Sequence, residues 1–228
     1  MKGDGQDCPS YNSMNTIWNV PNQLTIARLV LSVFCFVFLA LDWYLTALVL
    51  FIIAAGTDWV DGFWARRYGQ ITQLGRIMDP FADKIIICGA FIFLAAVPPA
   101  ANGTTKLPAS EIMAWMAVVV VARELLVTAL RSFFEEHGTD FSAQWPGKWK
   151  MLLQCAAVAV SLAQLWYYGF SSAFPPIWSE VPPRWTVTFP LRLLVWAAIV
   201  MTVYSGWVYV QTALRLLRST EPGARSGE

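Results

Sequence analysis

The chain has 228 residues, of which 57% are hydrophobic and 14% charged, and its formal net charge is +1. This composition excludes an ordinary soluble globular domain and predicts an all-α integral membrane protein. The near-zero net charge gives no information about partners, and we expect no nucleic-acid partner. A single histidine, His137, excludes a His-rich metal site, and four widely spaced cysteines are not typical of a disulfide or zinc framework.

Six apolar runs follow one another along the chain, each close to the roughly 20 residues that cross a bilayer. Residues 1–15 are predicted to be a flexible cytoplasmic tail. A short interfacial helix with Trp18 at the headgroups is expected to turn at Pro21 into the first span. The predicted spans cover residues 24–41, 44–65, 75–97, 108–134, 146–170 and 191–214. Residues 16–218 are expected to form one membrane domain, followed by a cytoplasmic tail at 219–228.

The distribution of lysine and arginine predicts the orientation. An even number of spans puts both termini on one side, together with the segment at 58–83. The loops of the other side hold only Lys106 and Arg184, with Arg192 at the end of a span. Because positive residues concentrate in cytoplasmic loops, we expect the termini and the 58–83 segment to face the cytoplasm.

Four carboxylates lie where the second and third spans meet. Asp58 and Asp61 are three residues apart and Asp79 and Asp83 are four apart, so each pair shares one helical face. The polar run at 66–70 is a break between antiparallel helices, and folding this hairpin brings the four acids together. Four like charges in a membrane protein need cations. Oxygen ligands favour Mg²⁺ or Mn²⁺, with two ions expected, and such metal pairs typically handle phosphates.

The spacing of the whole segment carries a family resemblance. It reads D-x2-D-G-x2-A-R-x8-G-x3-D-x3-D, without gap or substitution, over residues 58–83. This pattern resembles the signature of the CDP-alcohol phosphatidyltransferase family, whose substrates are a CDP-linked lipid and a small alcohol. The resemblance implies that Asp58 and Asp79 bridge both ions, that Asp61 holds the first and that Asp83 holds the second.

The resemblance also implies a binding surface for CDP-diacylglycerol. Its residues are Gly62 and Ala65, which lack bulk, Arg66, which suits a phosphate, Thr72 in the interhelical loop, and Gly75 at the start of the third helix. For the glycines, helix packing is the alternative. Asp83 is the candidate general base, with a purely metal-binding role as its alternative. Because nothing near the site resembles an activated Ser, Cys or His, direct displacement is favoured over a covalent intermediate.

A basic cluster in the second half of the chain predicts the acceptor. Arg123 and Arg131 are eight residues apart and share a helical face, and Lys148 and Lys150 begin the next span at the same cytoplasmic level. Intramembrane arginine usually faces an aqueous cavity or a partner. Arg123, Arg131 and Lys148 are therefore candidates to bind an acceptor phosphate. The alternatives are packing of Glu124 with Arg123 or Arg131 and snorkelling of the two lysines.

The stretches at 19–28, 122–131 and 147–150 resemble the phosphatidylglycerophosphate synthases of bacteria, a branch of the same family. That resemblance implies CDP-diacylglycerol and glycerol 3-phosphate as substrates, membrane lipids as surroundings, a homodimer, and the bacterial cytoplasmic membrane as location. Two alternatives stay open. The first is the same chemistry with another acceptor, such as inositol phosphate, serine or a second lipid. The second is a divalent-cation transporter that uses the four carboxylates.

Overall fold

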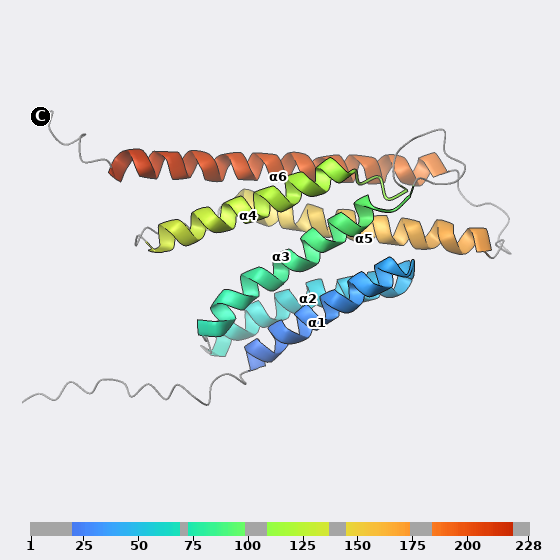
Figure 1. Ribbon diagram of the computed structural model, residues 1–228, viewed down its shortest axis with the longest axis horizontal. Coiled ribbons are helices and arrows are strands. Elements are labelled where there is room, and N and C mark those ends of the chain that lie inside the picture. The colour runs from blue at the N-terminus through green and yellow to red at the C-terminus, as the bar shows by residue number, and fades with distance from the viewer. Residues whose placement is uncertain (1–19, 69–72, 99–108, 137–144, 174–183, 221–228) are drawn as a thin grey trace, which may run out of the picture.

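The computed structural model describes residues 20–68, 73–98, 109–136, 145–173 and 184–220. Within these ranges every element is a helix, and the helices run back and forth along one long axis (Figure 1). They are α1 (Val20–Ala40), α2 (Tyr44–Tyr68), α3 (Gln73–Ala95), α4 (Ala114–Glu136), α5 (Trp145–Ala173) and α6 (Arg184–Thr220). For the part of the chain that the structure describes, the prediction of an all-α protein with six long helices is confirmed.

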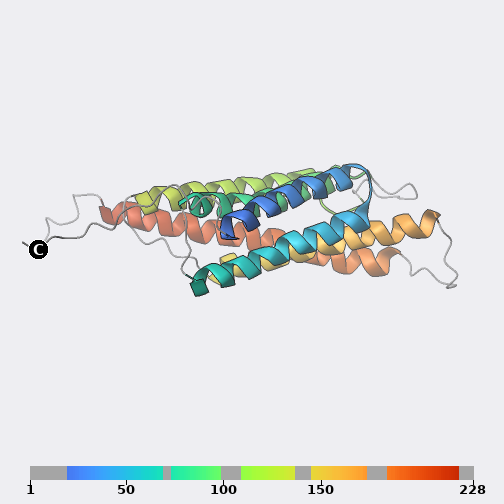
Figure 2. The same cartoon turned by 90° about the horizontal axis from the view of Figure 1, so that it is seen from below.

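The helices form two layers of three. Helices α4, α3 and α1 lie side by side in one layer, and α6, α5 and α2 lie in the other (Figure 2). Contacts between α4 and α6, between α3 and α5, and between α1 and α2 join the layers. The C-terminal end of α2, the start of α3 and the C-terminal ends of α4 and α6 all lie at one end of the bundle (Figure 1).

The outside of this bundle is apolar, as a lipid environment requires. Large apolar side chains such as Val118, Leu125 and Trp207 are exposed, whereas charged side chains including Arg123, Glu124 and Lys150 are buried. Three helices contain stretches long and apolar enough to cross a membrane, at Gln23–Ala40, Trp149–Tyr168 and Thr186–Leu216. Shorter apolar stretches lie in α2 and α3, at Tyr44–Thr57 and Lys84–Ala95. The chain is a multi-pass membrane protein.

The fourth helix begins at Ala114 and not near residue 108 as predicted. The preceding segment is not helical: Glu111 has a φ of 59°, outside the range of a right-handed helix. The Ser110 hydroxyl donates to the carbonyl of Leu94, at 2.6 Å, and Arg192 of α6 binds the Glu111 carboxylate at 2.9 and 3.2 Å. The segment at 109–113 is therefore anchored to α3 and α6 at the end of the bundle opposite to the motif.

Helices α1 and α6 each contain a proline. Helix α6 begins at Arg184, seven residues before the predicted start of the sixth span at 191, and continues through Pro190. Helix α1 includes Pro21 in its first turn, where a missing N–H costs no hydrogen bond. The predicted interfacial helix around Trp18 lies mostly outside the described residues.

The main apolar core lies toward the end of the bundle away from the motif. It includes Phe51, Phe91 and Leu94, each at most 1% exposed. Gly89 of α3 lets the ring of Phe36 lie against the helix backbone, because a Cβ atom at this position would collide with that ring. A second, smaller cluster of Val127, Phe134, Tyr209 and Ala213 packs α4 against α6 at the motif end.

Candidate active site

The backbone places the four motif aspartates at one end of the α2–α3 hairpin. Asp58 lies ten residues before the end of α2 at Tyr68, and Asp83 lies ten residues after the start of α3 at Gln73. Asp61 and Asp79 lie seven and six residues from the same two ends. Because all helical residues rise by the same amount, these positions pair at two matching levels of an antiparallel hairpin whose helices touch.

The donor set at this place fits a hard divalent cation. Both pairs are on continuous helix, where i,i+3 and i,i+4 positions share one face. Carboxylate oxygens are the ligands that Mg²⁺ and Mn²⁺ prefer. Gly62, Ala65, Arg66 and Gly75 lie on the same two helices. The side chains of all these motif residues, and the whole of Thr72, lie outside the described part of the structure.

A polar contact links this hairpin to α4. Lys84, which directly follows Asp83, donates from Nζ to the hydroxyl of Thr128. The Thr128 hydroxyl in turn donates to the carbonyl of Glu124, at 2.6 Å. The stretch of α4 between Arg123 and Arg131 therefore lies against α3 beside the last aspartate of the motif.

The Glu124 carboxylate joins two cations, one from α5 and one from its own helix α4. It binds Lys150 Nζ of α5 and lies 3.4 Å from Arg123 Nη1. The three side chains are less than 10% exposed, so this is a buried ion triad. Buried charges persist only when they are paired and hydrogen-bonded. The start of α5 is thereby held at the same level as the basic face of α4.

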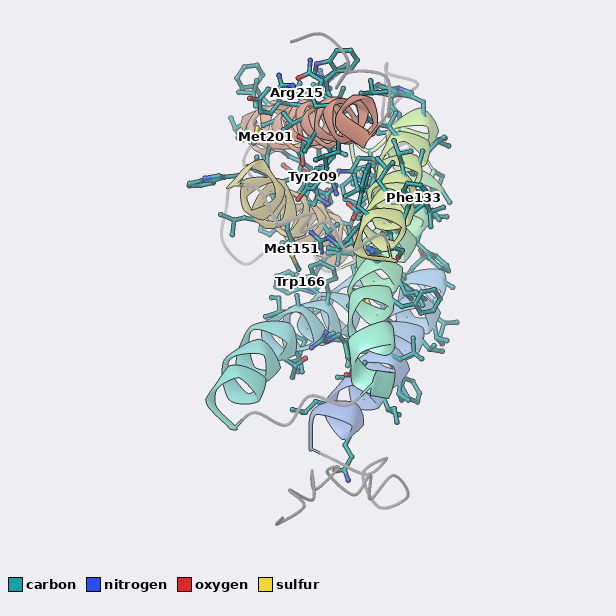
Figure 3. The ribbon with its side chains drawn as sticks, turned by 90° about the vertical axis from the view of Figure 1, so that its left-hand side faces the viewer. Phe133, Met151, Trp166, Met201, Tyr209 and Arg215 are labelled. Carbon is teal, nitrogen blue, oxygen red and sulfur yellow. The ribbon has the colours of Figure 1, made fainter. Side chains whose placement is uncertain are left out.

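Helix α6 also contacts the side chain of Arg123. Arg123 Nη2 donates to the Ser205 hydroxyl at 2.5 Å, and its Cζ lies 5.6 Å from the centre of the Tyr209 ring. Figure 3, viewed along the bundle from the motif end, shows Tyr209 between α4, α5 and α6. A cation over an aromatic face is attracted by the ring.

The predicted acceptor residues have different surroundings. Arg123 lies inside the ion triad, so the predicted alternative of a contact with Glu124 is observed. Arg131 lies two turns further along α4 and is partly buried; its Nε is buried and has no hydrogen-bond partner among the described residues. Lys148 is on α5, and its side chain is outside the described part. Lys150 does not snorkel, because it is 5% exposed and bound to Glu124.

The sequence analysis named Glu124 only as a packing alternative, and it missed Ser205 and Tyr209. The ion pair of Glu124 could have been expected from the sequence, since a carboxylate beside an arginine in an apolar run needs a buried partner. The contacts of Ser205 and Tyr209 could not, because hydroxyl-bearing residues are ordinary in a membrane helix. The described contacts set one carboxylate, Glu124, against two cations, Arg123 and Lys150, and Arg131 lies two turns further along α4. An excess of cations over carboxylates attracts anions.

Comparison with known proteins finds relatives that match most of the chain. A relative from Bacillus subtilis (strain 168) is 32% identical over 220 residues, covering 90% of this chain and all of the relative. One from Escherichia coli (strain K12) is 31% identical over 201 residues, covering 86% and 95%. One from Haemophilus influenzae is 29% identical over 202 residues, covering 86% and 94%. All three are named CDP-diacylglycerol–glycerol-3-phosphate 3-phosphatidyltransferase.

The sequence profile of one family matches most of the chain. The match covers residues 18–204, which include the carboxylate motif, the basic face of α4 and the start of α5. The spacing that resembled a family signature thus lies inside a match to that same family. The chain belongs to the CDP-alcohol phosphatidyltransferase family.

Proposed function

We propose that this protein transfers the phosphatidyl group of CDP-diacylglycerol to sn-glycerol 3-phosphate, giving phosphatidylglycerophosphate and CMP. The relatives at about a third identity are named for this reaction. The observation that carries the proposal is the contact between Lys84 and Thr128, which holds the stretch of α4 between Arg123 and Arg131 against α3, directly after the last aspartate of the motif. A phosphate-bearing acceptor bound to this stretch would lie next to a CDP-lipid held at the motif.

Members of this family generally depend on a divalent metal. For this chain we propose two ions, Mg²⁺ or Mn²⁺, held by Asp58, Asp61, Asp79 and Asp83. When bound, they offset the charge of the pyrophosphate and of the leaving phosphate. The all-carboxylate donor set and its matched levels on α2 and α3 support this assignment.

The residues of the chain then have distinct tasks. Gly62, Ala65 and Gly75 leave room for the nucleotide, while Arg66 and Thr72 offer donors to it. Arg123, Arg131 and Lys148 bind the phosphate of the acceptor and orient its free hydroxyl. Asp83 accepts the proton of that hydroxyl. The hydroxyl oxygen forms a bond to the β-phosphorus, and the bond from this phosphorus to the oxygen of CMP breaks, so that CMP leaves.

A product assay tests this function. Purified protein is incubated with CDP-diacylglycerol and Mg²⁺, and in separate reactions with glycerol 3-phosphate, glycerol, inositol phosphate or serine. We expect CMP release and a lipid product with glycerol 3-phosphate but not with glycerol or serine, because the cations of α4 and α5 select an acceptor with its own phosphate. The names of the relatives favour glycerol 3-phosphate over inositol phosphate. Equal activity with glycerol would contradict the proposed phosphate-binding site. A lipid product with another alcohol instead would identify that alcohol as the acceptor. Metal flux into vesicles without CMP release would instead indicate a transporter.

We also infer the bacterial cytoplasmic membrane as location, with the motif and both termini facing the cytoplasm. The ends of α2, α4 and α6 at one end of the bundle support this orientation, since most arginines and lysines lie there. A cysteine introduced at Gly69 should therefore react with an impermeant thiol reagent from the cytoplasmic side, and one at Asn102 from the opposite side. The reverse pattern would overturn the orientation.

We also propose a homodimeric assembly and two terminal tails outside the membrane domain. The resemblance supports a homodimer, which cross-linking in native membranes would detect. The family match to residues 18–204 supports a membrane domain at 16–218 between short tails at 1–15 and 219–228. Removal of either tail should leave phosphatidyl transfer intact. Loss of activity would mean that the removed tail is part of the membrane domain.

A further inference from the structure

The side chain of Arg123 is held by α6, a helix that contributes no residue to the carboxylate motif. Its Nη2 donates to Ser205 Oγ at 2.5 Å, and its guanidinium lies over the ring of Tyr209, 5.6 Å from the ring centre. Ser205 is 0% exposed and Tyr209 is 3% exposed. These contacts come from one face of α6, since residues four apart are neighbours on a helix.

A third residue of that face controls how closely Arg123 approaches. A Cβ atom built on Gly206 would lie 3.1 Å from Arg123 Cγ, closer than ordinary van der Waals contact. The absence of a side chain at Gly206 therefore lets the arginine stem pass directly along the backbone of α6. Its guanidinium can then reach Ser205 and Glu124 at the same time.

We propose that Ser205, Gly206 and Tyr209 are positioning residues that orient the Arg123 guanidinium for the acceptor phosphate. This inference rests on the proposed function. Two contacts fix the Nη1 and Nη2 ends of the guanidinium, whereas its Nε has no hydrogen-bond partner among the described residues. A guanidinium is planar, so fixing both Nη ends and one ring face also fixes the direction of its remaining N–H groups. A donor oriented before binding loses less freedom when the anion arrives.

Ser205→Ala in the full-length protein tests the proposal. We expect the KM for glycerol 3-phosphate to rise about three- to tenfold, because a hydrogen bond to a charged group is lost. The KM for CDP-diacylglycerol and kcat should change by less than about twofold, because Ser205 acts only through Arg123. Ser161→Ala is the matched control. Ser161 is also 0% exposed and donates to a carbonyl, that of Ser110 at 3.2 Å, but at the other end of the bundle.

Gly206→Ala provides an independent variant, since it keeps every polar group and only displaces the stem of Arg123. It should raise the same KM selectively. In an Arg123→Lys background, Ser205→Ala should add less than about a twofold change, because a lysine cannot bridge Ser205 and Glu124 in the same way.

Three results would overturn the proposal: an unchanged KM for glycerol 3-phosphate in both single variants, an equal rise of both KM values, or a full additional effect of Ser205→Ala in the Arg123→Lys background. Each of these would leave Ser205 and Gly206 as packing residues only. Absence of phosphatidylglycerophosphate formation by the wild-type protein would instead remove the proposed function itself, so the two failures are distinguishable.

Discussion

Asp58→Asn and Asp79→Asn should each reduce phosphatidyl transfer by at least about a hundredfold, as much as the loss of one oxyanion-hole donor costs in other enzymes. Each change removes one negative charge and one ligand oxygen from a set of four carboxylates on two touching helices. In the proposed site both ions share these two carboxylates, so neither ion would keep its full ligand set. CMP release from CDP-diacylglycerol, followed at saturating Mg²⁺, measures the loss.

Asp42→Asn is the matched control for this pair. Asp42 is exposed in the turn between α1 and α2, at the opposite end of α2 from the motif. It accepts a hydrogen bond from the Tyr44 hydroxyl at 2.6 Å. Asparagine tolerates its φ of 60° and can accept the same bond, so we expect normal activity. All three variants should elute from size exclusion like the wild type. Near-normal turnover of Asp58→Asn or Asp79→Asn would exclude the two-metal site.

Glu124→Met should destabilise the protein by about 3–5 kcal/mol, the usual cost of breaking a buried ion pair from one side. The change leaves Lys150 and Arg123 buried without their shared carboxylate. Lys150→Met should cost less, because Glu124 then keeps Arg123 at 3.4 Å. The order of thermal unfolding temperatures in detergent is therefore expected to be wild type, then Lys150→Met, then Glu124→Met.

The double variant Glu124→Met/Lys150→Met should recover most of the stability lost in Glu124→Met. Methionine fills a similar volume, and the second substitution removes the uncompensated ammonium from the bundle. The coupling between the two substitutions is expected to be large, as for residues in direct contact. If the two effects simply add, the ion pair between α4 and α5 does not contribute to the stability of the protein.

The helical context of the motif followed from the sequence. Its spacing predicted a shared helical face for each pair of aspartates, because a helix has a fixed number of residues per turn. The described backbone is helical at all four positions, but α2 continues to Tyr68, through three residues of the predicted break at 66–70, and α3 begins at Gln73. The ends of other helices were less predictable. Pro190 lies inside α6, and the non-helical segment at 109–113 is held by tertiary contacts of Ser110 and Glu111.

By itself, the sequence determined that this chain is an all-helical membrane protein, that its carboxylates come in two pairs, and that basic residues follow on α4 and α5. Each of these features depends on local composition or on spacing within one helix. Only the tertiary structure decided the partners of the buried charges: Glu124 with Lys150, Arg123 with Ser205 and Tyr209, and Lys84 with Thr128. These contacts join separate helices, and no periodicity within one helix encodes which faces of two helices meet. They follow from packing six helices in two layers, where each buried charge must find a partner away from lipid.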